Sequence, residues 1–188
     1  IYPIDALSFS DKEIDSEIDF IRKNKGKIAA IGEVGLDFKE DLENHDRQKR
    51  IFEKFVKLSI ELNIPIIIHS RKAEIECIEI LEKNSAKKVI MHCFSGKLSL
   101  INRIVGNGWM LTVPTSVKNS EHFQKIIEMV DIKHLLCETD SPYLHPDKKW
   151  PNEPANVIAS YEKIAEIKKL KLEDIKKKIW ENYKNCFT

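Results

Sequence analysis

The sequence predicts an α/β protein built on parallel strands, and two observations indicate this class. Short apolar runs of strand length alternate along the chain with longer amphipathic segments of helix length. The apolar runs are nearly continuous instead of alternating with polar residues, which indicates strands covered on both faces. We therefore expect a parallel sheet wrapped by helices.

The elements can be placed in order along the chain. After a stub of strand at residues 1–3, Ser10 and Glu13 have the spacing of a capping box that starts a helix. Pro65 opens a later strand, and the helix before it shows apolar residues at three- and four-residue steps. The further elements are expected as strand 28–31, helix 44–63, strand 64–69, helix 73–83, strand 88–93, helix 98–105, strand 109–113, helix 122–130, strand 134–140, and helices 157–168 and 172–185.

Size and charge limit what the chain can be. Its 188 residues predict a single domain over 1–188, whereas a complete eight-stranded α/β barrel typically needs about 250 residues. The 31 basic and 30 acidic residues give a formal charge of +1, so no global field attracts nucleic acid or an acidic membrane. A polyanion such as DNA would have to be bound by basic residues at one site, not attracted by the charge of the whole chain.

Four widely spaced cysteines, Cys77, Cys93, Cys137 and Cys186, contain no CxxC pair. We therefore expect reduced thiols and a cytoplasmic location. No run approaches the roughly 20 apolar residues of a membrane helix, and no segment resembles a secretory leader, so neither a membrane nor export is expected.

Four strand-like runs end in residues of types that commonly act as metal ligands. Glu33 follows the first run, His69 and His92 end the next two, and Asp140 follows the last. Because parallel α/β folds gather their chemistry at the carboxyl ends of strands, these side chains are predicted to surround one pocket. Two carboxylates and two imidazoles around a cation indicate a metal-dependent hydrolase.

Three of these residues, and the nearby Arg71, also have interpretations that involve no metal. Glu33 alone could be a turn residue that faces solvent, and His69 could be a hydrogen-bonded core histidine. Asp140 could cap the next helix, and Arg71 could make a surface salt bridge, although its planar fork also suits a phosphate. The matching positions of His69 and His92 favour the metal site.

Taken in order, the segments IGEVGLD, IPIIIHSRKA, VIMHCFSG and ETDSPYL with NEPANV resemble the TatD family of metal-dependent deoxyribonucleases over essentially the whole chain. The resemblance implies a TIM-barrel (β/α)8 hydrolase of the amidohydrolase type that cuts phosphodiester bonds in DNA. It implies a divalent cation, commonly Mg²⁺, with Mn²⁺ or Zn²⁺ as alternatives. It also implies roles for individual residues: Glu33, His69, His92 and Asp140 as metal ligands, Glu33 and Asp140 in catalysis, and Arg71 and Asp37 as substrate-binding residues that support the pocket.

The sequence departs from the TatD pattern in two places. TatD-like proteins ordinarily begin with an HxH pair on the first strand, and this chain has no HxH. We therefore expect a barrel that is incomplete at the amino end, with its gap filled by an absent segment, another copy of the chain, or disorder. The second departure is Lys149-Trp150-Pro151, where the family often carries an arginine and a glycine.

Two other functions stay open, the second of them because the HxH pair is missing. One is the hydrolysis of a small amide or ester, because the same cation and water can attack carbon. The other is a catalytically impaired barrel fragment that only binds its ligand. The number of metal ions, the polarity of cleavage and the oligomeric state have no signal in the sequence.

Overall fold

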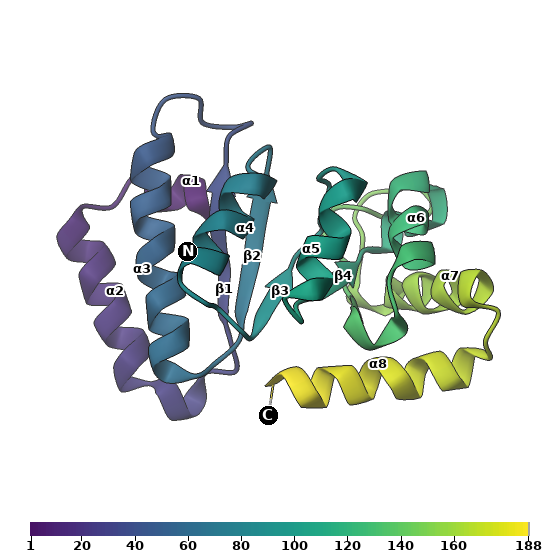
Figure 1. Ribbon diagram of the computed structural model, residues 1–188. Coiled ribbons are helices and arrows are strands. Elements are labelled where there is room, and N and C mark those ends of the chain that lie inside the picture. Colours follow the sequence, from purple (N-terminus) through teal and green to yellow (C-terminus); the bar gives the residue numbers. More distant parts are fainter. Residues whose placement is uncertain (188) are drawn as a thin grey trace. The chain divides into compact units, whose positions relative to one another are not determined.

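The computed structural model describes residues 1–187, which form two compact units, residues 1–96 and residues 97–186 (Figure 1). Each unit contains parallel strands with helices between them, which confirms the α/β class. Among the described residues, no helix has the length and apolar character needed to cross a lipid bilayer. The single domain expected over 1–188 stays a prediction.

The first unit contains three parallel strands in the order β1, β2, β3. Helix α3 packs on β1, α4 packs on β2, and α2 lies beside α3 (Figure 1). Phe52 and Phe55 of α3 are buried in the core, as its spacing predicts. The elements of this unit are α1 (Pro3–Ala6), α2 (Asp11–Lys23), the 3-10 turn η1 (Lys25–Lys27), β1 (Ile31–Asp37), α3 (His45–Leu62), β2 (Ile66–Arg71), α4 (Glu74–Lys83) and β3 (Val89–Met91).

The prediction for the first strand is wrong, because β1 begins at Ile31 where the predicted strand 28–31 ends. Gly32 and Gly35 both lie inside this strand. They allow β1 to approach β2 closely: a Cβ on Gly35 would lie 1.9 Å from the carbonyl oxygen of His69. A Cβ on Gly32 would lie 2.6 Å from the Cβ of Ile67.

The strand stub at residues 1–3 is also wrong, because helix α1 begins at Pro3. A proline in the first helical turn loses no hydrogen bond, since the amide there has no partner within the helix. The capping box is confirmed at α2, where the Ser10 Oγ accepts from the Glu13 N–H and the Glu13 Oε2 accepts from the Ser10 N–H at 2.7 Å. The capping signal therefore gave the start of α2 correctly, whereas the start of α1 was mistaken for a strand.

The second unit contains the parallel pair β4 and β5, with Leu111 in register with Leu135. The buried side chain of Asn182 in α8 donates to the carbonyl oxygens of Ile132, at 2.7 Å, and Leu135, at 2.9 Å, and so ties α8 to the start of β5. The elements are η2 (Leu98–Leu100), α5 (Ile101–Gly106), β4 (Met110–Val113), η3 (Thr115–Asn119), α6 (Glu121–Met129), η4 (Ile132–His134), β5 (Leu135–Cys137), η5 (Pro154–Val157), α7 (Ile158–Lys168) and α8 (Leu172–Phe187).

Candidate metal centre

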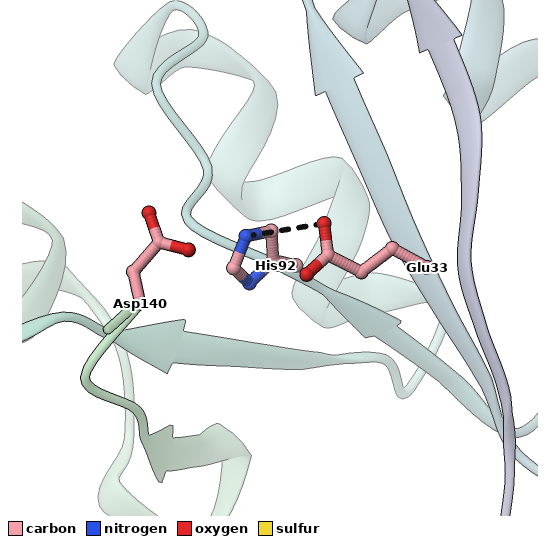
Figure 2. Close-up of side chains that lie close together, drawn as sticks. All are labelled: Glu33, His92 and Asp140. Carbon is pink, nitrogen blue, oxygen red and sulfur yellow. Dashed lines mark ion pairs between the residues drawn. The ribbon is translucent and has the colours of Figure 1, made fainter. Parts of the chain in front are cut away.

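The carboxylate of Glu33 faces two imidazole rings. Its Oε2 lies 3.5 Å from the Nε2 of His92 and 3.9 Å from the Nδ1 of His69. Figure 2 shows the Glu33 side chain reaching from β1 toward the His92 ring, with the ion pair marked. Three chain segments therefore bring one carboxylate and two imidazoles together within the first unit.

The strand positions of these residues differ from the prediction. Glu33 lies inside β1, and His69 lies inside β2, which continues to Arg71. The register between the two strands is irregular between Ile31 and Val34, at the position of Glu33. Such an irregularity re-aims a side chain, so it accounts for an acidic group that points to the site from mid-strand.

His69 is oriented by a buried carboxylate. Its Nε2 lies 2.9 Å from the Oδ2 of Asp37, and the edge of its ring packs against Tyr2, with centroids 5.0 Å apart. Because an ionised carboxylate only accepts hydrogen bonds, the neutral imidazole carries its proton on Nε2. Its Nδ1 lone pair is then directed toward Glu33, as in histidine ligands held by a second carboxylate.

Asp37 is fully buried at the end of β1 and has its hydrogen bonds satisfied. Besides His69, its carboxylate accepts from the Tyr2 hydroxyl at 2.9 Å and from the N–H groups of Lys39, at 3.0 Å, and Glu40, at 2.9 Å. Burial alone would raise the pKa of the Asp37 carboxyl, but the hydrogen bonds from Glu40, His69 and Tyr2 outweigh it and hold the pKa below its usual value. Asp37 is therefore ionised and fixed.

Two residues that support Asp37 were missed in the sequence. The buried side chain of Gln48 accepts from the Asp37 N–H at 2.8 Å and donates to the Asp37 carbonyl at 3.1 Å. Gln48 occupies the buried stripe of α3, four residues before Phe52, and a polar residue in such a stripe signals a buried hydrogen-bond partner. Tyr2 has no comparable signal, because its contact spans 35 residues of chain.

Arg71, at the end of β2, lies at the margin of this network. Its Nη1 is 3.9 Å from the Asp37 Oδ2, and its side chain is 44% exposed. The contact is long, and the side chain is partly exposed. Arg71 can thus donate to an anionic ligand without breaking the Asp37 network.

Taken separately, each imidazole lies close enough to the Glu33 carboxylate for the two to bind the same divalent metal ion. Metal to nitrogen or oxygen distances of about 2.0–2.2 Å allow two ligands of one ion to lie up to about 4.4 Å apart. The 3.5 Å and 3.9 Å separations from Glu33 to His92 and His69 are both within this limit. One carboxylate oxygen with imidazole nitrogens is a donor set typical of hydrolytic metal centres.

Asp140 belongs to the second unit, where it follows β5. Its backbone has a φ of +58°, a conformation that aspartate tolerates better than most residues, and its carbonyl accepts from the Tyr143 N–H at 2.8 Å. The strand ends at Cys137, earlier than the predicted residue 140, so Asp140 lies on the loop. Its role as a metal ligand stays a prediction, as do the ligand roles of Glu33, His69 and His92.

A model of the TatD related DNase family matches residues 1–188. The chain belongs to this family. It is 41% identical over 181 residues to an uncharacterized metal-dependent hydrolase of Methanocaldococcus jannaschii, covering 96% of this chain and 71% of that protein. It is 34% identical over 177 residues to the deoxyribonuclease TATDN3 of Homo sapiens, covering 92% of this chain and 65% of that protein.

Solved structures of the TatD family have the same fold. The crystal structure of YJJV, a TatD homologue from Escherichia coli K12, matches 100% of this chain and 74% of its own, with a TM-score of 0.91 at 23% identity. A TatD family hydrolase from Entamoeba histolytica gives a TM-score of 0.86 at 22% identity. The TIM-barrel type of fold expected from the resemblance is confirmed.

Membership of the TatD family identifies the chain as a metal-dependent hydrolase by class. The chain spans 71% of the archaeal relative and 65% of the human relative, about two thirds of their length. The reaction and substrate of this chain are therefore taken up as proposals.

Proposed function

We propose that this chain hydrolyses phosphodiester bonds in DNA with a water molecule activated at a divalent metal ion. The observation that supports this most is the Glu33 carboxylate facing two imidazoles, one of them oriented by a buried carboxylate. Human TATDN3, which carries the name deoxyribonuclease, supports DNA as the substrate. Mg²⁺ is the proposed cation, and Mn²⁺ and Zn²⁺ are the alternatives that the mixed donor set also suits.

The ligands would be Glu33, His69 and His92, with Asp140 as a further ligand. When bound, a divalent cation would polarise a phosphoryl oxygen and lower the pKa of a bound water molecule toward neutrality. Asp37 keeps the proton of His69 on Nε2, so that Nδ1 retains the lone pair a ligand needs.

The remaining residues act on the water and the substrate. The Asp140 carboxylate orients the attacking water and accepts its proton, which is the task of a general base. The Arg71 guanidinium donates to a non-bridging phosphate oxygen and holds the phosphodiester in place. The proposed catalytic roles of Asp140 and Arg71 are therefore the first to test by substitution.

A labelled single-stranded oligonucleotide incubated with the chain and Mg²⁺ or Mn²⁺ tests the proposal. Cleavage is expected, with loss in EDTA and in Asp140→Asn. Asp147→Asn is the matched control, because Asp147 lies on the same loop but pairs with Lys118 at 2.5 Å and is expected to leave cleavage unchanged. Full turnover by Asp140→Asn would falsify its role.

The same preparations separate the alternatives. Hydrolysis of a p-nitrophenyl ester without cleavage of any oligonucleotide would show that the site hydrolyses small esters or amides instead of DNA. A chain that contains no cation after purification with added metal, and that cleaves neither substrate, would support the impaired barrel fragment. Elemental analysis of the purified chain provides that measurement.

A further inference from the structure

We propose that Tyr143 and Trp150 form an aromatic platform on which an unpaired base of single-stranded DNA stacks. This inference rests on the proposed function and names the form of the substrate that the same site would take. The platform lies on the loop between Asp140 and η5, in the second unit. It is defined by these two rings alone.

Both rings are exposed although they are large and apolar. Tyr143 is 63% exposed and Trp150 is 67% exposed, and their centroids lie 5.5 Å apart with planes tilted by 59°. At this tilt the two rings are not stacked flat on each other. Base stacking on such rings is a common way to bind single strands, because every base has a π-face.

Hydrogen bonds hold the loop beneath the platform in one conformation. The buried side chain of Asn152 donates to the carbonyl oxygens of Thr139, at 2.8 Å, and Tyr143, at 2.7 Å, and its N–H donates to the carbonyl of Pro142 at 2.8 Å. Because the backbone is already fixed, ordering it upon binding costs little entropy. The two rings are therefore exposed on a segment whose backbone is held by hydrogen bonds.

The platform is tied to the proposed general base. The Tyr143 N–H donates to the Asp140 carbonyl at 2.8 Å, so one tight turn separates the ring-bearing segment from that carboxylate. Lys148 and Lys149, which precede Trp150, are both exposed. The neighbouring Asp147 forms its ion pair with Lys118 and interacts with Lys149 at longer range. Apolar faces beside exposed lysine side chains suit a nucleotide, whose base stacks while its phosphate meets the lysines.

A second exposed aromatic pair provides a control within the same chain. Trp180 and Tyr183 of α8 lie with centroids 5.2 Å apart and planes only 12° from parallel. Each ring thus covers one face of the other. Trp180→Ala removes an exposed tryptophan of similar accessibility, 57%, outside the loop of Asp140.

The test is the affinity for labelled oligo(dT), its duplex, and an abasic strand of equal length, measured by fluorescence anisotropy in EDTA. Stacking of one base changes affinity by roughly 5- to 150-fold, so Trp150→Ala and Tyr143→Ala are each expected to weaken oligo(dT) binding within this range. Trp150→Phe is expected to retain most of the affinity, and Trp180→Ala all of it. The duplex is expected to bind more weakly than the single strand, because its bases stack on one another.

The abasic strand separates stacking from charge. It keeps the phosphates and lacks the bases, so wild type and Trp150→Ala are expected to bind it equally. The proposal is overturned if wild type does not bind oligo(dT), if Trp150→Ala binds it like wild type, or if the variant loses as much affinity for the abasic strand. Since no hydrolysis occurs in EDTA, these outcomes are independent of the cleavage assay with Asp140→Asn, and circular dichroism confirms that each variant is folded.

Discussion

Replacing Asp37 tests how the orientation of His69 governs metal binding. In Asp37→Asn the new NH2 group must replace one carboxylate oxygen, and the Oδ1 position is held by the N–H groups of Lys39 and Glu40. The NH2 group therefore takes the Oδ2 position and faces the His69 Nε2, which must then accept instead of donate. The ring proton moves to Nδ1 and blocks the lone pair directed at Glu33.

The expected magnitude follows from that change. Loss of a residue that orients a metal ligand typically weakens metal affinity by about 10- to 100-fold. Because Asn keeps the shape and part of the hydrogen bonding, we expect a loss of only about 1–2 kcal/mol in the free energy of unfolding. Asp37→Ala leaves several buried donors without an acceptor and is expected to cost about 3–5 kcal/mol.

Isothermal titration with Mn²⁺ and urea unfolding measure the two quantities on the same preparations. Tyr2→Phe is the matched control, because it removes one hydrogen bond to Asp37 and leaves the contact with His69 intact. It is expected to keep most of the metal affinity. Wild-type Mn²⁺ affinity in a folded Asp37→Asn would refute the reasoning about the tautomer, and with it the ligand role of His69.

Three further predictions concern packing and reactivity. Gly35→Ala forces a Cβ to within 1.9 Å of the His69 carbonyl oxygen and is expected to cost about 3 kcal/mol or more in urea unfolding; a neutral effect would contradict the close approach of the strands. Asn182→Ala leaves the Leu135 carbonyl without its donor and is expected to cost about 1–3 kcal/mol, whereas an unchanged midpoint would show that α8 is held otherwise. Burial raises the pKa of the Cys77 thiol, so iodoacetamide at mildly alkaline pH is expected to modify it only after unfolding, as mass spectrometry of the peptides would reveal.

Elements whose signal is local could be predicted from the sequence. Helix α3 was expected over 44–63 and extends over His45–Leu62, because its apolar residues repeat with the helical period. The start of α2 was found from Ser10 and Glu13, since a capping box lies within four residues of chain. His92 was expected to end a strand, and it directly follows β3.

Strand β1 could not be predicted in the same way, because its glycines serve a contact with another strand. Gly35 weakens a strand by its own propensity, and only the adjacent His69 carbonyl explains why no side chain fits there. The support of the site was equally hidden. Tyr2, Gln48 and Asp37 come together through contacts between distant segments, which no local pattern contains.

The sequence named Glu33, His69 and His92, and Asp37 as a residue that supports the pocket, but it did not indicate Tyr2 or Gln48. Glu33, His69 and His92 were selected by residue type and by the ends of apolar runs, and in the structure Glu33 faces both rings. Asn152, which fixes the loop after Asp140, was not selected, because an asparagine next to prolines is typical of any turn.

The central claim is that Glu33 binds a divalent cation together with at least one of the imidazoles of His92 and His69. Anomalous diffraction from crystals soaked in Mn²⁺ tests this most directly. The account predicts a peak about 2.0–2.2 Å from the Glu33 Oε2 and within the same range of His92 Nε2 or His69 Nδ1. A strong Mn²⁺ peak elsewhere, with Glu33 uncoordinated, would contradict it.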